Sequence, residues 1–429
     1  MGPQACRCLS YCRLPQTLHI RCLFIMIFFS LLLLYGVWNI NLPIQTHAPL
    51  AKAKSRTLKL PTDSVLSEST CAPGQTPSLY RNFFRQYAWV QMELPHDVVY
   101  SISDTNESLP LIFWDRRILY HPVSSEGCRY RCRYTLNMTE ARKAHLAVFT
   151  ANPPPSILRD HGDTILAFES AEPYQFVAWL SEMAKRKISF FITHHTFAPV
   201  SAYYGVYRAF KSPNCVMSAE EREALKRQNS LHLLPAHHSQ RSKMVAWVVS
   251  DMKAFNRRKE LADAISKYVL VDTYGKHGMK CQKRWECFKV LSKQYKFYLS
   301  FENNNCEGYI TEKFFVNALG YGMVPIVYGA SREEFYNRAP PNSYIHVDDF
   351  ENVEELTKYL QYLDKNDTAY ATYFAWKEHG EILLWPRVDC RVCGMLHHSL
   401  QGKVPLPRNS YWDYYNKSIT CSAKSRIKF

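Results

Sequence analysis

The residues best placed for chemistry lie in one stretch, from Phe301 to Lys313. The pattern predicts a buried strand that ends there, a polar loop, and a helix that begins near Thr311. Lys313 brings a positive charge to the first helical turn, where backbone amides already attract phosphate oxygens. The carboxylate of Glu312 is suited to accept hydrogen bonds from ribose hydroxyls or to face positive charge that develops on a sugar. An ordinary capped helix with solvated Glu312 and Lys313 explains the same residues, and spacing alone favours that simpler interpretation.

Short apolar runs alternate with helical patterns along the rest of the chain, which predicts a parallel α/β architecture. Two Rossmann-like halves of this kind would face a cleft at their strand ends, where ligands bind in such sheets. A polar segment at residues 226–242 separates the halves. The first half has predicted strands at 111–114, 146–149, 164–168 and 188–192 and a helix at 174–187; the second has strands at 244–249, 268–271, 297–301 and 324–328 and helices at 253–267, 311–319 and 352–363.

An uncharged run at residues 22–40 precedes both halves. A helix needs about 20 apolar residues to cross a bilayer, whereas the apolar part of a cleaved signal peptide has about 7–15. We therefore predict an uncleaved transmembrane signal anchor at 22–40 behind a cytoplasmic tail at 1–21. Residues 41–78 are rich in proline, serine, threonine and lysine, which is typical of a stem.

The compartment is indicated by groups that follow this span. Basic residues flank it on both sides, so the positive-inside rule does not fix its orientation. Ten cysteines follow the span, which is typical of an oxidising compartment. Asn-x-Ser/Thr sequons, which are glycosylated only in a secretory lumen, follow it at Asn106, Asn137, Asn366 and Asn416. We expect a type II membrane protein with most of its mass in the lumen.

Bulk composition excludes some classes. Hydrophobic residues make up 47% of the 429 residues and charged residues 21%, which indicates a globular rather than a disordered chain and fits two domains. The formal net charge is +15, but the basic residues form no dense block. Spread charge of this kind is usually a solvated surface, and a lumenal protein does not meet nucleic acid.

The run at residues 309–313, Tyr-Ile-Thr-Glu-Lys, with Phe-Glu-Asn at 301–303, resembles the signature of the α1,3-fucosyltransferase family. The likeness covers residues 243–395 in the family's order and spacing. It includes residues 245–250, 271–275, 324–329, 340–341 and 344–350.

This resemblance implies a GT-B fold of two Rossmann-like domains, GDP-fucose as donor, and inversion at the fucose anomeric carbon. It implies an acceptor-side domain at 79–235, a GDP-fucose-binding domain at 243–395 and a C-terminal extension at 396–429, in a single-pass type II protein of the Golgi membrane. The expected acceptors are N-acetylglucosamine-containing glycans of glycoproteins. The donor-binding residues of the family correspond to Asn303, Tyr309, Glu312 and Lys313, and its pyrophosphate-binding arginine to Arg258, with Arg257 as an alternative one residue away.

The family's catalytic base corresponds to Glu169, which directly follows a predicted strand. A carboxylate there would remove the proton of the attacking acceptor hydroxyl. The family carries Glu-Ser-Pro at this point, whereas this chain has Glu-Ser-Ala at 169–171 and then Glu172-Pro173. The next family motifs are also changed, to Phe-Phe-Ile-Thr-His-His at residues 190–195. The acceptor half has diverged, so the acceptor hydroxyl, and the choice between glycan core and antenna, stay open.

The chain contains no Asp-x-Asp pair, which many sugar-nucleotide enzymes use to hold a metal ion. We therefore expect no essential metal or other cofactor, and we interpret the His pairs at 194–195, 237–238 and 397–398 as surface or polar-core residues. Cys390 and Cys393 fit zinc, redox or structural roles, and an oxidising lumen favours disulfides. Cys128, Cys132, Cys281 and Cys287 are further candidates for a disulfide framework, whose connectivity the sequence leaves open.

Two rival functions follow from the same residues. The first is transfer from another sugar nucleotide, which the donor signature disfavours. The second is a catalytically silent, lectin-like membrane protein, which only the altered acceptor half supports.

Overall fold

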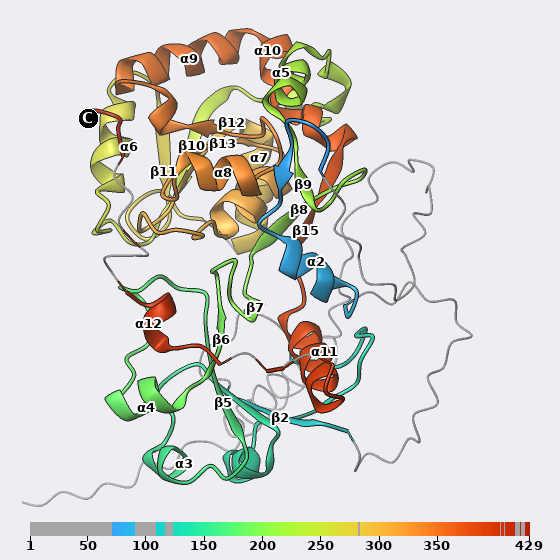
Figure 1. Ribbon diagram of the computed structural model, residues 1–429. Helices are drawn as coiled ribbons and strands as arrows, with labels where there is room; N and C mark the ends of the chain where they lie inside the picture. The colour runs from blue at the N-terminus through green and yellow to red at the C-terminus, as the bar shows by residue number, and fades with distance from the viewer. Residues whose placement is uncertain are drawn as a thin grey trace, which may run out of the picture. The chain divides into compact units, whose positions relative to one another are not determined.

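The computed structural model describes residues 71–90, 109–115, 123–281, 284–403, 405–406, 408–416, 421 and 425–429 (Figure 1). The predicted cytoplasmic tail, signal anchor, most of the stem and Asn106 lie outside these residues. Within the described ranges, no helix has the length and apolar character needed to cross a bilayer. The described residues form an α/β protein with two parallel sheets.

The first sheet has six parallel strands in the order β3-β2-β4-β5-β6-β7. Except for β3, which is partly exposed, its strands are short runs that are buried along nearly their whole length, as is typical of parallel strands. Four strands that the sequence predicted are confirmed to within two residues at each end. The strands are β2 (Leu111–Trp114), β3 (Arg133–Thr135), β4 (Leu146–Phe149), β5 (Ile165–Ser170), β6 (Phe190–Thr193) and β7 (Val200–Ser201), with helices α3 (Pro155–Arg159) and α4 (Glu182–Lys187).

The second sheet has five parallel strands in the order β11-β10-β12-β13-β14. Helices α6 and α9 share one apolar core with it, and α7 packs into another (Figure 1). The strands are β10 (Lys243–Val248), β11 (Val271–Tyr274), β12 (Tyr295–Phe301), β13 (Val324–Tyr328) and β14 (Ile345–His346). The helices are α6 (Arg258–Ser266), α7 (Arg284–Gln294), the π-helix η4 (Lys313–Ala318), α8 (Arg332–Arg338), α9 (Val353–Lys365) and α10 (Asp367–Ala371), followed by the 3₁₀ turn η7 (Thr372–Glu378).

The chain returns to the first sheet after the second one is complete. Helix α11 (Val388–Leu400) packs its apolar face on Ile112 and Val148 and lies beside the first sheet (Figure 1). Two disulfides, Cys128–Cys390 and Cys132–Cys393, fix it there. The predicted domain boundary at residue 395 therefore falls inside α11. Helix α12 (Tyr411–Tyr414) also packs in the core of the first sheet, so the region predicted as a C-terminal extension is partly core.

Two small antiparallel sheets join segments that are distant in the sequence. Strand β8 (Gly205–Ala209) pairs with β15 (Gly380–Leu384). Strand β1 (Thr76–Pro77) pairs with β9 (Cys215–Val216), and the Cys71–Cys215 disulfide lies beside this pairing. The last part of the predicted stem, residues 71–78, thus belongs to the folded unit. The remaining helices are α2 (Arg81–Tyr87) and α5 (Ala219–Arg227).

Three predicted elements differ from the structure. The helix predicted at 174–187 begins only at Glu182, because the Ser181 hydroxyl caps it by accepting from the Ala184 amide. The helix predicted at 253–267 begins at Arg258, since Arg257 has a left-handed backbone with φ of 59°. The strand predicted at 268–271 lies instead at 271–274, where β11 pairs with β10 from Val271 onward.

Candidate functional site

The loop that links β12 to η4, residues 302–312, lies at the carboxyl end of a central parallel strand. Glu302, at the start of this loop, is 1% exposed and binds Thr311 near the end of the loop. Its Oε1 accepts from the Thr311 amide at 2.8 Å and its Oε2 accepts from the Thr311 hydroxyl at 3.0 Å. We call residues 302–312 the donor loop. Sequence analysis gave Glu302 no role, although it is a carboxylate that directly follows a wholly buried strand.

Lys313, the first residue of η4, is surrounded by oxygen atoms. Its Nζ lies 3.0 Å from Glu302 Oε2 and 3.4 Å from Glu312 Oε1, and it donates to the Thr311 hydroxyl at 2.9 Å. Burial opposes the charge of Lys313, but the two carboxylates outweigh burial and raise its pKa above the ordinary value. The ammonium is therefore charged at neutral pH and fixed at the end of the donor loop.

Arg258 is the first residue of α6 and is 4% exposed. Its Nη1 donates to the Phe301 carbonyl and its Nη2 to the Asp251 carbonyl, both at 2.8 Å. Burial lowers the pKa of Arg258. The positive charge of Arg258 in turn acts to lower the pKa of Lys313. The alternative, Arg257, is exposed and pairs with Glu260 at 3.4 Å. Of the two arginines, Arg258 is the one held at the strand ends beside the donor loop.

Tyr309 joins the donor loop to the first half of the protein. It is 2% exposed, and its hydroxyl donates to Glu172 Oε2 at 3.1 Å. Burial raises the pKa of Tyr309 well above its ordinary value. Burial also raises the pKa of Glu172, although the Tyr309 hydrogen bond and the Lys313 charge oppose this. Glu172 was missed as a site residue, since no spacing in the sequence shows a contact across 137 positions.

Asn303 leaves one buried polar atom of the donor loop available. Asn303 is half-buried, and its Oδ1 is buried with no hydrogen-bond partner among the described residues. Glu312 is half-buried at the start of η4. Gly308 has φ of +71°, and a Cβ there would lie 3.3 Å from the His194 carbonyl oxygen, so a side chain would be strained. The Cys306–Cys421 disulfide, which sequence analysis did not predict, ties the loop to the C-terminal segment.

Glu169 lies in β5 of the first sheet and is 3% exposed. Its Oε2 accepts from the Trp114 indole nitrogen at 2.8 Å, which fixes the orientation of the carboxyl group. A small cavity of about 30 Å³ is lined by Glu169, Tyr203, Tyr204 and Trp385. The carboxyl group is thus buried and fixed beside a small space. Glu172, which contacts the donor loop, follows three positions later in the chain.

The predicted site residues therefore fall into two groups. Asn303, Tyr309 and Glu312 lie in the donor loop, Lys313 directly follows it, and Arg258 lies beside it. Glu169 lies in the other sheet, at the end of its strand. A fixed pair of cations suits a diphosphate, and a buried carboxyl group suits proton removal.

A groove of about 330 Å³ lies at the carboxyl ends of β13 and β14, next to the donor loop. Asn305, Tyr328, His346 and Asp348 are among the residues that line it. Ligands of open parallel sheets bind at such strand ends. This groove is large enough to receive a ring system of nucleobase size.

The predicted disulfide cysteines are all paired in the structure. All six predicted cysteines form disulfides, in the pairs Cys128–Cys390, Cys132–Cys393 and Cys281–Cys287. Cys132 and Cys393 lie near His397, but their disulfide leaves no thiolate for a metal. His194 and His195 are buried, as expected for polar-core residues.

Three predicted sequons lie within the described residues. Asn137 is exposed and caps a 3₁₀ turn at Met138–Lys143. Asn366 is partly exposed and caps α10 by accepting from the Ala369 amide. Asn416 is also partly exposed.

Comparison with known proteins gives consistent matches. Residues 238–408 match the family model "Glycosyltransferase family 10 (fucosyltransferase) C-term". Glycoprotein 3-alpha-L-fucosyltransferase A of Drosophila melanogaster is 44% identical over 195 residues, which are 44% of this chain and 38% of that protein. Alpha-(1,3)-fucosyltransferase fut-1 of Caenorhabditis elegans is 35% identical over 187 residues, 41% of this chain and 42% of that protein.

A human relative and a solved structure complete the comparison. The human 4-galactosyl-N-acetylglucosaminide 3-alpha-L-fucosyltransferase FUT5 is 38% identical over 164 residues, 38% of this chain and 43% of that protein. The matched region thus spans less than half the length of these relatives. A solved structure titled "Crystal Structure of alpha1,3-Fucosyltransferase" has a TM-score of 0.47 and 16% identity, over 76% of this chain and 98% of that chain. The family resemblance inferred from the sequence motifs is confirmed by the family model and the curated relatives.

Proposed function

Because residues 238–408 match a fucosyltransferase family model, we propose that the protein is an α1,3-fucosyltransferase that transfers fucose from GDP-fucose to N-acetylglucosamine-containing glycans of glycoproteins. The observation that carries this proposal is the charged Lys313, which directly follows the donor loop and is held by Glu302 at the carboxyl end of β12 inside the matched segment. The names of the relatives support the same reaction, since each is described as a fucosyltransferase.

In this proposal the two sheets belong to the two Rossmann-like domains of a GT-B enzyme. Lys313 and Arg258 bind the diphosphate and stabilise the negative charge that grows on GDP as the glycosidic bond breaks. Glu312 accepts hydrogen bonds from the ribose hydroxyls, and Asn303 and Tyr309 make further contacts with GDP-fucose. The cation pair takes the role that a divalent metal has in other sugar-nucleotide enzymes, so catalysis requires neither a metal nor another cofactor.

Glu169 is the proposed catalytic base. It removes the proton of the acceptor hydroxyl while that oxygen bonds to the fucose anomeric carbon, on the face opposite the departing GDP. The bond to GDP breaks, and the configuration at the anomeric carbon is inverted. The hydrogen bond from Trp114 to Glu169 keeps the carboxylate aimed at one position.

We propose residence in the Golgi membrane as a single-pass type II protein, with residues 22–40 as signal anchor, a stem that follows it, and the catalytic part in the lumen. The five disulfides among the described residues support an oxidising compartment. The proposed partners are GDP-fucose, a glycoprotein or oligosaccharide acceptor and the Golgi membrane, without nucleic acid.

The test is transfer of labelled fucose from GDP-fucose by the secreted lumenal part, residues 41–429. A panel of N-glycan acceptors with core and antennal N-acetylglucosamine identifies the acceptor, and parallel reactions contain EDTA. Transfer that survives chelation supports the proposal in full. Binding of GDP-fucose without transfer to any acceptor would favour the silent, lectin-like alternative, and transfer from a different sugar nucleotide would refute the donor assignment.

A further inference from the structure

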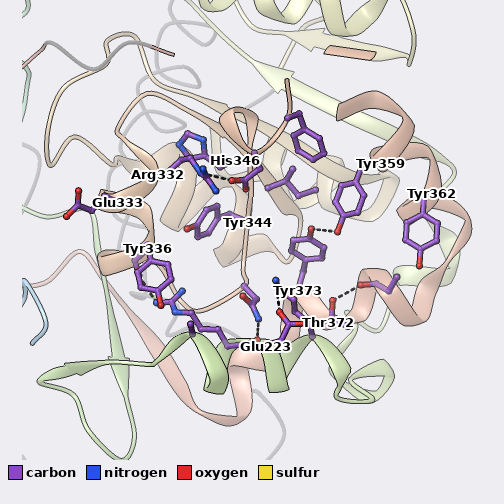
Figure 2. Close-up of a pocket in the computed structure, with 18 residues that line it drawn as sticks. Glu223, Arg332, Glu333, Tyr336, Tyr344, His346, Tyr359, Tyr362, Thr372 and Tyr373 are labelled. Atoms are coloured by element: carbon purple, nitrogen blue, oxygen red, sulfur yellow. Dashed lines mark hydrogen bonds and ion pairs between the residues drawn. The ribbon is translucent and has the colours of Figure 1, made fainter. Parts of the chain in front are cut away.

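A cavity of about 900 Å³ lies beside the edge strand β14, and none of the predicted donor-binding residues lines it (Figure 2). Its walls come from α5, α8, β14, α9, α10 and η7. Ligand pockets in proteins typically have volumes of about 300–1,000 Å³. The cavity is therefore large enough for a ligand of several rings that is bound apart from the donor.

Tyrosines dominate the walls of this cavity. The hydroxyls of Tyr359 and Tyr373 are 2.8 Å apart and face each other (Figure 2). Tyr359 and Tyr362 stack with ring centroids 6.2 Å apart. A tyrosine presents an apolar ring face and a hydroxyl on the same rigid group, which matches the apolar and hydroxylated faces of a sugar ring. The tyrosines that line the cavity, which we call the tyrosine pocket, are Tyr336, Tyr344, Tyr359, Tyr362 and Tyr373.

The charged groups of the tyrosine pocket balance one another. Three cationic side chains and three carboxylates line it: Arg222, Lys226, Arg332, Glu223, Glu333 and Asp349. Arg332 pairs with Asp349 at 2.7 Å, and the Arg222 guanidinium lies 3.8 Å from the centre of the Tyr336 ring. Arg332 is therefore neutralised by a carboxylate, and Arg222 is occupied by an aromatic ring. The pocket therefore lacks the excess of positive charge that a phosphate or nucleotide would require, and it suits a neutral ligand.

A sequon lies at the rim of the pocket. The side-chain amide nitrogen of Asn366, the atom that carries an N-glycan, donates to the Tyr362 hydroxyl at 3.1 Å. Ala369 and Thr372, which follow Asn366 in the chain, line the pocket. A glycan on Asn366 would start beside these rings. The side-chain oxygen of Asn366 caps α10, so the asparagine is held in place at the rim.

We propose that the tyrosine pocket binds a neutral saccharide, at a site separate from the donor loop. Two sources supply this chemistry: the protein's own glycan at Asn366, and a glycan of a bound glycoprotein. The proposal does not depend on fucose transfer, because none of Arg258, Asn303, Tyr309, Glu312 and Lys313 lines the pocket. Arg332, Glu333 and His346 line both the pocket and the groove of about 330 Å³ beside the donor loop, so binding is measured in the absence of GDP-fucose.

The test measures binding of a desialylated biantennary N-glycan to the detergent-solubilised full-length glycoprotein by saturation-transfer NMR and calorimetry, without GDP-fucose. Tyr336→Ala and Tyr362→Ala each remove one ring from the pocket, and each should weaken binding about tenfold. Tyr268→Ala is the matched control, because Tyr268 is 50% exposed, close to the 52% of Tyr362, and lies outside the pocket. If Tyr336→Ala lowers the melting temperature, Tyr362→Ala alone decides.

Thr368→Ala distinguishes the two sources. It destroys the sequon but keeps Asn366 as the cap of α10. Binding to the wild type that the pocket variants weaken supports the proposal with an external glycan. Binding that appears only in the Thr368→Ala protein, and is lost again when Tyr362→Ala is added, supports it with the protein's own glycan as the occupant. Absence of binding to both proteins, or binding that the pocket variants leave unchanged, overturns the proposal.

Discussion

The Cys306–Cys421 disulfide provides the sharpest quantitative test of how the donor loop is held. It closes a segment of 115 residues, whereas the Cys281–Cys287 disulfide closes one of 6 residues. Each bridge joins one buried cysteine, Cys306 or Cys287, to one partly exposed cysteine. The two bridges are therefore matched in burial and differ mainly in the length of chain that they constrain.

The expected cost of removing each bridge follows from that length. In the chain-entropy treatment, a closed segment of 115 residues stabilises the folded state by about 5 kcal/mol, and one of 6 residues by about 2 kcal/mol. Replacing Cys306 and Cys421 together by Ala should cost about 5 kcal/mol of unfolding free energy. The same replacement of Cys281 and Cys287 should cost less than half as much. Both variants lose two sulfur atoms, so packing losses largely cancel in the comparison.

Urea unfolding of a protein that comprises residues 41–429 measures the stability difference, and calorimetry measures GDP affinity. The Cys306/Cys421 variant should also bind GDP more weakly, because Cys306 lies inside the donor loop between Asn303 and Tyr309. The Cys281/Cys287 variant should bind GDP as the wild type does. Equal destabilisation by the two variants would refute the entropic reasoning. Unchanged GDP affinity in the Cys306/Cys421 variant would show that the disulfide does not position the donor loop.

Three further predictions concern the chemistry of the site. Glu169→Gln should lower kcat by about 10²–10⁴ while the Kd for GDP stays unchanged, and Trp114→Phe should cause a smaller loss, as steady-state kinetics and calorimetry will show. Lys313→Ala should weaken GDP-fucose binding about tenfold or more, since a charge-assisted contact with the diphosphate is lost; unchanged donor affinity would remove Lys313 from the site. Burial raises the pKa of Glu172, so its carboxyl group ionises beside the donor loop only as pH rises above the ordinary value of about 4.3. GDP affinity should therefore fall as pH rises through that raised pKa, and Glu172→Gln should lose this pH dependence; an identical profile in both proteins would contradict the assignment.

Much of the two sheets could be predicted because parallel strands that are buried on both faces leave continuous apolar runs. Strands such as β4 and β13 are buried along their whole length, and their predicted bounds are confirmed. The helix predicted at 174–187 shows the limit of periodicity. Phe176 and Met183 have helical spacing, yet both are exposed, and a serine cap at residue 181 decides where the helix begins.

The path of the chain after β15 could not be predicted from local patterns. Cys390 and Cys393 have the spacing of a local pair, but they bond to Cys128 and Cys132, which lie 262 and 261 positions away. The spacing of four cysteines is compatible with several pairings, and only the packing of α11 against the first sheet selects one. The same reasoning explains why Glu302 was missed, because its partners depend on how the donor loop folds back.

The departures from the family pattern bear on the donor as well as on the acceptor. Sequence analysis placed them in the acceptor half, where Glu172 follows the altered run Glu-Ser-Ala and His194 lies in the altered run at residues 190–195. In the structure both side chains contact Tyr309 of the donor loop: Glu172 accepts from its hydroxyl, and the His194 ring packs edge-on against it at 5.4 Å between centroids. Burial lowers the pKa of His194 well below the ordinary value, although the backbone of Ala171 and of Glu307 opposes this, so His194 acts as a neutral packing group. The changed residues thus set the position of a predicted donor-binding residue, and acceptor choice and donor affinity are expected to have diverged together.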